Sequence, residues 1–148
     1  MTAITLAKTE DLDRLLPLVR AFHAESAMDV SEENRLSSLK PVVEGSPFGG
    51  VWLLGPSRAP IGYVVICFGW SIEFGGMDGF VDELYIRESV RGRGIGTEVL
   101  INLPKQLSQS GLKAVHLEVS RVAVRTQEAY KRAGFKPRAD YMLMTRKL

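Results

Sequence analysis

The sequence predicts a single α/β domain built around a mixed sheet. The first observation is a β-hairpin, because apolar runs at 51–54 and 61–69 are separated by the turn-forming residues 55–60. The second is the order that follows, in which strand-like runs at 80–86 and 113–119 each precede a helix-like run. This alternation after an initial hairpin is typical of an α/β arrangement with a mixed sheet. A chain of 148 residues is long enough for one such domain.

Each element has a local signature. Ile4 and Leu6 alternate with polar residues, as in a short strand, and apolar residues recur at helical spacing after the Thr9 cap. Gly134 follows an amphipathic run and is a natural left-handed helix stop. Residues 46–50 and 71–79 are expected to be loops on composition. The expected helices cover 10–25, 31–43, 97–110 and 125–133, and the expected strands cover 4–6, 51–54, 61–69, 80–86, 113–119 and 141–145.

The composition is that of an ordinary globular domain, with 45% hydrophobic and 24% charged residues. A net charge of +2 is too small to argue for a nucleic acid or a membrane surface as partner. No apolar run is long enough to span a membrane, and the first residues lack the pattern of a signal peptide. The one cysteine, Cys67, suits a reducing compartment and lies in an apolar run. We therefore expect a cytoplasmic protein in which this thiol is buried.

The most informative stretch is Val-Arg-Gly-Arg-Gly-Ile-Gly-Thr at 90–97, between a predicted strand and a predicted helix. Glycines there let the backbone approach a ligand closely. The N–H groups of a helix's first turn have no partners inside the helix, and the helix dipole favours an anion beside them. Arg91 and Arg93 add permanent positive charge and donors that fit phosphate oxygens. Residues 91–97, which we call the cradle, are therefore predicted to bind a pyrophosphate.

The spacing of the glycines separates the ligand classes that use such a cradle. A nucleotide P-loop needs G-x-x-x-x-G-K-[ST], which does not occur here. A dinucleotide fingerprint needs G-x-G-x-x-G, whereas Gly92, Gly94 and Gly96 are spaced G-x-G-x-G. The pattern Arg91-x-x-Gly94-x-Gly96 instead resembles the acetyl-coenzyme A signature, R/Q-x-x-G-x-G/A, of the GNAT superfamily of N-acetyltransferases.

A second stretch supports the same resemblance. Tyr-Lys-Arg-Ala-Gly-Phe at 130–135 is similar to the family landmark Y-x-x-x-G-F, and it follows the first landmark in the right order. The order of elements matches the GNAT arrangement along nearly the whole chain, and the sequence match is strongest from about Val81 to Phe135.

The resemblance implies one GNAT domain over residues 1–148, with a mixed, mostly antiparallel sheet of six or seven strands flanked by about four helices. It also implies that the fourth and fifth strands splay apart to admit the pantetheine arm of acetyl-CoA. Backbone groups of the fourth strand would pair with the pantetheine amides, and one N–H would polarise the acetyl carbonyl. The acetyl-CoA-binding residues implied in this way are Leu84, Tyr85, Ile86, Arg91, Gly92, Arg93, Gly94, Ile95, Gly96 and Thr97.

Acetyl transfer to an amine needs a base, because an alkylamine with a pKa near 10 is protonated at neutral pH. Asp82 and Glu83 are the candidates, and they point to opposite faces of a regular strand. Asp82 is favoured, because it shares the parity of Leu84 and Ile86. Similar polyamine-type members also carry an acidic pair here, with the first acid facing the substrate. A bulge would reverse the choice, and Glu83 could instead anchor an arginine.

Tyr130 is the candidate general acid, because the family's tyrosine at this place lies near the cofactor sulfur. The alternative is a packing tyrosine on an amphipathic helix. The family often has an Asn before this helix where Ala123 stands, so one hydrogen bond is missing or supplied elsewhere. His23 and Glu25 lie where GNAT members often build the acceptor pocket, although His23 could be a surface or capping residue. Two histidines and one cysteine give no metal-ligand spacing, so no metal is expected.

The sequence therefore predicts an acetyl-CoA-dependent N-acetyltransferase that acts by direct transfer in a ternary complex, since no placed thiol suggests an acetyl-enzyme. The expected acceptor is a primary amine of a small molecule. The alternatives are a peptide or protein N-acetyltransferase, and a sensor that binds acyl-CoA without turnover. Many relatives pair through their C-terminal strands, so a homodimer fits the resemblance without following from the sequence.

Overall fold

The centre of the computed structural model, which describes residues 1–148, is a five-stranded sheet in the order β1-β2-β3-β4-β5. The strands are β1 (Ile4–Leu6), β2 (Gly49–Leu54), β3 (Gly62–Ser71), β4 (Gly76–Ile86) and β5 (Leu112–Leu117). Neighbouring strands pair antiparallel except β4 and β5, which are parallel. The predicted α/β class and the mixed, mostly antiparallel sheet are confirmed.

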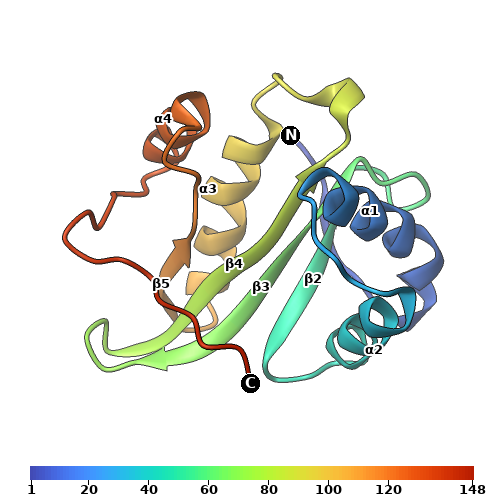
Figure 1. Ribbon diagram of the computed structural model, residues 1–148, viewed down its shortest axis with the longest axis horizontal. Coiled ribbons are helices and arrows are strands. Elements are labelled where there is room, and N and C mark those ends of the chain that lie inside the picture. The colour runs from blue at the N-terminus through green and yellow to red at the C-terminus, as the bar shows by residue number, and fades with distance from the viewer.

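Four α-helices flank the sheet, as expected. They are α1 (Leu12–Glu25), α2 (Glu32–Val43), α3 (Ile95–Ser108) and α4 (Val124–Arg132). Short 3-10 turns, η1 (Thr9–Asp11) and η2 (Glu88–Val90), precede α1 and the loop before α3. In Figure 1, α1 and α2 lie together beside β2 and β3, and α4 lies next to α3 near β5.

The central strand β3 contributes to two cores, one on each face of the sheet. Tyr63 and Val65 pack against α1 and α2 on what we call the α1 face. Val64 and Ile66 pack against α3 on the opposite face, the α3 face. Tyr63, Val64 and Ile66 are fully buried. Because successive side chains of a strand alternate between faces, a strand that is apolar throughout must be covered on both sides.

The predicted last strand, 141–145, is not formed, so the sheet has five strands and not the expected six or seven. Residues 135–148 contain no helix or strand, and the large apolar side chains at 141–144 are 67–82% exposed. A strand needs a neighbour for its backbone groups and cover for its apolar side chains. This segment has neither, and an ion pair of 3.1 Å joins Arg138, just before it, to Glu73 between β3 and β4.

The β3–β4 hairpin is longer than predicted. β4 begins at Gly76 and β2 at Gly49, both inside stretches that were expected to be loops. Strand pairing overrides composition here, because residues 76–79 all pair with β3. At Gly79 a Cβ would meet Cγ2 of Ile66 at 2.9 Å, so close packing requires the glycine. Cys67 on β3 is exposed and not buried as expected.

Candidate functional site

β4 and β5 separate at one end of the sheet. Their parallel ladder ends at the pair of Val81 with Leu117. β4 then continues to Ile86 with β3 on one side and no strand on the other. We call this opening the fork. It lies where the resemblance implied that two strands splay apart.

The open edge of β4 presents backbone groups of alternate residues. Ladder bonds alternate along antiparallel strands, and the N–H of Arg87 bonds to Ile61 beside β3. Backbone groups of Tyr85 therefore face β3, whereas those of Leu84 and Ile86 face the fork. Of the three residues expected to bind pantetheine through the backbone, two are placed to pair with an extended ligand.

The cradle follows β4 and leads into α3. Gly92 and Gly94 have φ of +77° and +78°, a conformation that glycine adopts without strain, and Gly94 is the N-cap of α3. The backbone N–H groups of residues 92–97 donate to no other group of the chain. Six consecutive free donors lie at the positive end of a 14-residue helix, an arrangement that favours an anion beside it.

The two arginines of the cradle differ in their surroundings. Arg91 is engaged within the chain, because it forms an ion pair of 2.6 Å with Glu25 and donates its Nε–H to the carbonyl of Ile86 at 2.8 Å. Its guanidinium also lies over the ring of Tyr85, 5.4 Å from the centroid. Arg93 is exposed and makes no ion pair, so it is free to meet an anion. Glu25, expected in the acceptor pocket, lies instead against the cradle.

Of the two acids of β4, Asp82 lies in a β-bulge and Glu83 does not. Glu83 pairs with Val65 and Val81 with Ile66, which leaves Asp82 without a partner on β3. The parity argument that favoured Asp82 therefore does not apply, and another observation takes its place. Asp82 is exposed and its side chain makes no hydrogen bond or ion pair, whereas both oxygens of Glu83 are occupied.

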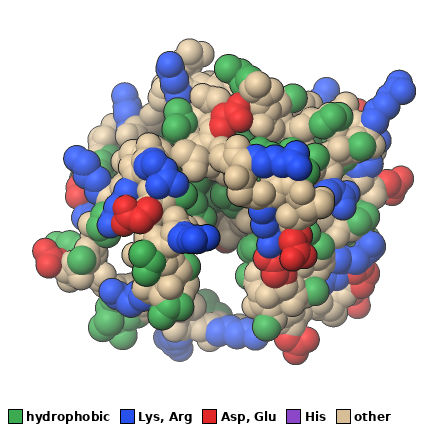
Figure 2. All heavy atoms as spheres, turned by 90° about the horizontal axis from the view of Figure 1, so that it is seen from above, with side chains coloured by type: hydrophobic (Ala, Val, Ile, Leu, Met, Phe, Trp, Pro, Cys, Tyr) green, Lys and Arg blue, Asp and Glu red, His purple; other side chains and the backbone are tan.

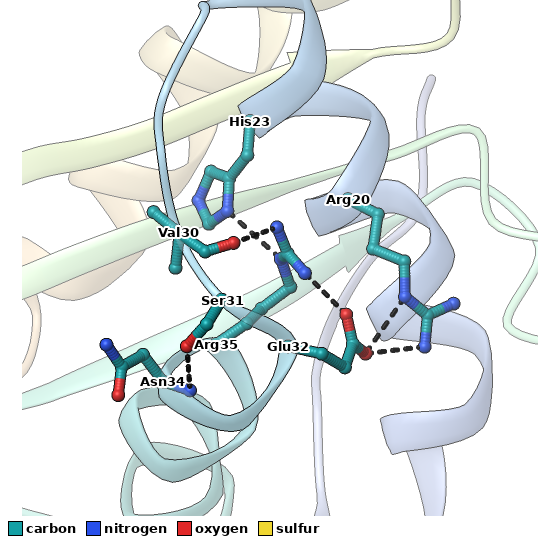
Figure 3. Close-up of polar contacts among 7 residues, drawn as sticks. All are labelled: Arg20, His23, Val30, Ser31, Glu32, Asn34 and Arg35. Atoms are coloured by element: carbon teal, nitrogen blue, oxygen red, sulfur yellow. Dashed lines mark hydrogen bonds and ion pairs between the residues drawn. The ribbon is translucent and has the colours of Figure 1, made fainter.

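Glu83 belongs to a buried polar network that includes His23. Its Oε1 accepts from the hydroxyl of Tyr63 at 2.8 Å, and its Oε2 lies 2.7 Å from Nε2 of His23. Arg35 of α2 donates its Nε–H to Nδ1 of His23 at 3.1 Å, as Figure 3 shows. Because Nδ1 accepts, the proton of the neutral ring is assigned to Nε2, which donates to Glu83. Burial and the charge of Glu83 raise the pKa of Tyr63, so its hydroxyl remains a donor.

Arg35 is a residue of this network that the sequence did not reveal. It also donates to the carbonyl of Val30 at 3.1 Å and pairs with Glu32, which in turn pairs with Arg20 (Figure 3). The available signal was weak, because an arginine in the first turns of a predicted helix is usually solvated.

Tyr130 lies on α4, half-buried against the α3 face, with its ring 6.2 Å from that of Phe135. Burial raises the pKa of its hydroxyl, which therefore stays protonated near neutral pH. Ala123 occupies the N-cap of α4 and supplies no side-chain cap. Gln127 compensates in part, because its amide donates to the carbonyls of Ser120 and Arg121 at 2.8 and 2.9 Å. The loop that an Asn could have ordered is thus ordered from within α4.

An apolar groove of about 1180 Å³ runs past the outer edge of β5, between α3, α4 and the C-terminal segment. Viewed from the end of the molecule at which α3 begins, Lys and Arg side chains gather around a hollow (Figure 2). His116 of β5, which the sequence reading passed over, lines the groove and lies 3.2 Å from Asp78 of β4.

No group of three or more His, Cys, Asp or Glu side chains is arranged to hold a metal ion. None of the helices combines the length and apolar character that crossing a membrane requires.

Three solved structures illustrate the likeness of the whole fold. The integron cassette protein HFX_CASS3 from the mobile metagenome of Cole Harbour Salt Marsh is 27% identical, with a TM-score of 0.83 over 98% of this chain and 90% of its own. The aminoglycoside N-acetyltransferase AAC(6')-Iy, in complex with a bisubstrate analogue, is 12% identical, with a TM-score of 0.81 over 100% and 99%. The ribosomal-protein-alanine N-acetyltransferase of Brucella melitensis biovar Abortus 2308 is 16% identical, with a TM-score of 0.76 over 100% and 99%.

No curated protein sequence matches the chain. Its residues 13–135 match the acetyltransferase (GNAT) family, a span that includes β4, the cradle, α3, β5 and Tyr130. The protein therefore belongs to the GNAT family of acetyltransferases.

Proposed function

We propose that the protein is an acetyl-CoA-dependent N-acetyltransferase that acetylates a primary amine of a small molecule by direct transfer in a ternary complex. The observation that carries the proposal is the run of six free N–H groups at residues 92–97, next to the open edge of β4. A diphosphate on these donors would leave the rest of an extended cosubstrate pointing along the fork. Family membership supports the same reading, because the matched span contains both features.

Different residues of the site bind the cosubstrate, polarise the acetyl carbonyl and donate a proton to the thiolate. Free N–H groups of the cradle and the exposed Arg93 bind the diphosphate. The open-edge backbone groups of Leu84 and Ile86 bind the pantetheine arm as an added strand would, and one N–H polarises the acetyl carbonyl. The neutral amine nitrogen then forms a bond to the acetyl carbon, the carbon–sulfur bond breaks, and the nitrogen releases a proton as the amide forms. Tyr130, whose raised pKa keeps its proton in place, donates that proton to the departing thiolate.

The acceptor is proposed to approach on the α1 face, where Asp82 contributes a free negative charge. Asp82 and Glu83 together raise the pKa of Tyr63, after burial as the first cause, so both charges act on this face. A cationic amine is attracted to such a place, and Asp82 is the acid with oxygens free to receive it. We assign Asp82 to the acceptor ammonium group and Glu83, with His23, to holding the strand beside it.

A second candidate acceptor is a peptide N-terminus, which is also a primary amine. The ribosomal-protein-alanine N-acetyltransferase shares the fold at 16% identity, and so does AAC(6')-Iy, an aminoglycoside enzyme. The unpaired carboxylate of Asp82 favours a small, densely cationic acceptor over a neutral peptide chain. A sensor that binds acyl-CoA without turnover is the non-enzymatic alternative.

A homodimer and a cytoplasmic location are further parts of the proposal. The free outer edge of β5 and the exposed apolar residues 141–144 are complementary features that two copies could bring together. The single free thiol suits a reducing compartment. Molar mass measured by light scattering, with and without residues 139–148, tests the dimer.

Calorimetric titration with acetyl-CoA, followed by a thiol-release assay with putrescine, neamine and alaninamide, tests the proposed function. Binding followed by amine-dependent thiol release supports it, and the preferred amine identifies the acceptor class. Binding without release for any amine points to the sensor. Absence of binding contradicts the assignment of the cradle and with it the proposed function.

A further inference from the structure

The two histidines of the chain both contact a carboxylate, but their second nitrogens differ. In His23, Nε2 faces Glu83 and Nδ1 accepts from Arg35, so neither nitrogen can take a proton from a ligand. In His116, Nε2 lies 3.2 Å from Oδ2 of Asp78, and Nδ1 makes no hydrogen bond. Because a carboxylate only accepts, Nε2 carries the proton, and Nδ1 of His116 presents a free lone pair.

The side chain of His116 is also more exposed to solvent than that of His23. The side chain of His23 is 8% exposed and closed in by α1 and α2. The side chains of His116 and Asp78 are 30% and 24% exposed, and His116 lines the groove at the outer edge of β5. Phe74 lies against the imidazole, with ring centroids 5.5 Å apart. His116 is therefore held in position on one side and accessible on the other.

His116 lies on the α1 face next to the fork. Cys67, Phe80 and His116 pair across three strands, so their side chains form a row on one face. Cys67 shares the parity of Tyr63 and Val65, which identifies this as the α1 face, and it is exposed because α1 and α2 end before it. The pair that follows Phe80 with His116 is the last one before β4 and β5 separate.

The charge of Asp82 affects a side chain of the same row, that of Cys67. The pKa of Cys67 is raised by desolvation and then by the negative charges of Asp82 and Glu83. Along β4, Asp82 follows Phe80 by two residues, a rise of about 7 Å in a strand. A ligand amine at the mouth of the fork can thus contact Asp82 on one side and His116 on the other.

We propose that His116 is the general base for the acceptor amine and that Asp78 is its positioning residue. The inference rests on the proposed function and completes it. The ammonium group, held by Asp82, transfers one proton to Nδ1 of His116. Asp78 stabilises the imidazolium that results, and the neutral amine attacks the acetyl carbon while the carbon–sulfur bond breaks and the thiolate takes the proton of Tyr130. The second proton lost by the attacking nitrogen returns to Tyr130 through solvent, and the proton on His116 passes to solvent. The overall change is amide, free thiol and one released proton.

The different roles of Asp82 and His116 follow from the different basicities of a carboxylate and an imidazole. A base is most effective when its proton affinity matches the working pH, and imidazole is the side chain that changes charge between pH 5 and 8. An exposed carboxylate is a far weaker base and a better counter-ion. Asp78 is the ionic group that contacts the imidazole. The same groove is also lined by Glu118, beyond the end of β5, and by Arg138 of the C-terminal segment, which is paired with Glu73.

The test is the pH profile of kcat/KM for His116→Gln and Asp78→Asn with acetyl-CoA and the best amine among putrescine, neamine and alaninamide. At pH 7 we expect His116→Gln to lose about 100-fold, the size of a general-base contribution. The loss should shrink to within about tenfold near pH 10, because there about half of an amine with a pKa near 10 is deprotonated without help. Asp78→Asn should show a smaller loss with the same dependence on pH. Lys113→Gln on β5, whose side chain lies over Gly76 and makes no hydrogen bond or ion pair, is the matched control and should keep the wild-type profile.

A purely structural role predicts a different result. Loss of packing would lower activity by the same factor at every pH, and such parallel profiles would overturn the proposal, as would wild-type activity in His116→Gln. Nitrogen-15 NMR of histidine-labelled protein gives a readout without turnover: the neutral ring of His116 should carry its proton on Nε2 and a free lone pair on Nδ1, whereas Nδ1 of His23 should accept a hydrogen bond from Arg35. If the neutral ring of His116 carries its proton on Nδ1, the proposal fails even though acetyl-CoA binds and the enzyme turns over.

Discussion

Arg35 donates its Nε–H to Nδ1 of His23 across 3.1 Å, and this contact determines what His23 can do. It joins α2 to α1, and His23 in turn reaches Glu83 on β4. The three side chains are 8–14% exposed, so the network is almost dry. A buried polar network in which every member is paired rigidifies its surroundings. Both ring nitrogens of His23, which was expected to contact the acceptor, therefore have partners within this network.

Replacing Arg35 by Met should destabilise the fold by about 1–3 kcal/mol, because Nδ1 of His23 and the carbonyl of Val30 would lose their donors in a buried place. Acetyl-CoA affinity should not change, since the cradle is elsewhere. Denaturant unfolding provides the measurement. Arg20→Met is the control, because Arg20 pairs with the same Glu32 in solvent and its loss should leave the unfolding free energy nearly unchanged. Equal effects of the two variants would contradict the structural role of Arg35.

Gly94→Glu should lower acetyl-CoA affinity by more than about 100-fold, or roughly 2.8 kcal/mol. The variant puts bulk and a negative charge among free donors that await a diphosphate. A side chain at φ +78° also costs about 1–2 kcal/mol of stability. Gly75→Glu separates the two effects, because Gly75 has φ of +77° and open space in the β3–β4 hairpin. Calorimetry should show lost binding only for Gly94→Glu, and unchanged affinity there would remove the pyrophosphate assignment.

Asp82→Asn should change the KM for the acceptor, whereas Glu83→Gln should change the stability of the fold. The first should raise KM for a cationic acceptor about tenfold, or about 1.4 kcal/mol, with no change in stability, because Asp82 makes no contact within the chain. The second should cost about 1–3 kcal/mol of stability, because an amide nitrogen cannot accept from Tyr63 or His23. Steady-state kinetics and unfolding measured on both variants decide between the acids. A stable Glu83→Gln protein with a raised KM would reverse the assignment.

Tyr130→Phe should lower kcat by about 100-fold and leave acetyl-CoA affinity unchanged. The pH dependence of wild-type activity should reflect the same role of Tyr130. A proton donor acts only while protonated, and burial raises the pKa of Tyr130, so its contribution persists through neutral pH and is lost only at alkaline pH, above the ordinary tyrosine range. Stopped-flow or steady-state turnover checks the first statement. Activity equal to wild type in Tyr130→Phe would exclude the hydroxyl from the mechanism.

The sequence by itself determined the features that depend on neighbours along the chain. The cradle is such a feature, because positive φ at Gly92 and Gly94 and the start of α3 are local properties of a strand–glycine–helix sequence. The hairpin, the four helices and the stop at Gly134, with φ of +97°, follow from periodicity and turn chemistry in the same way. The resemblance to the family rested on two such local stretches, the cradle and residues 130–135.

Tertiary structure alone decided which distant side chains meet. Pairing with β3 places the bulge at Asp82, and this removes the basis on which strand parity had favoured Asp82. The contacts of His23, Glu25 and His116 join residues 12 to 66 positions apart, and no local spacing encodes them. The absence of the last strand has the same origin. A strand exists only where a neighbouring edge accepts it, and residues 141–145 carry the propensity without a partner.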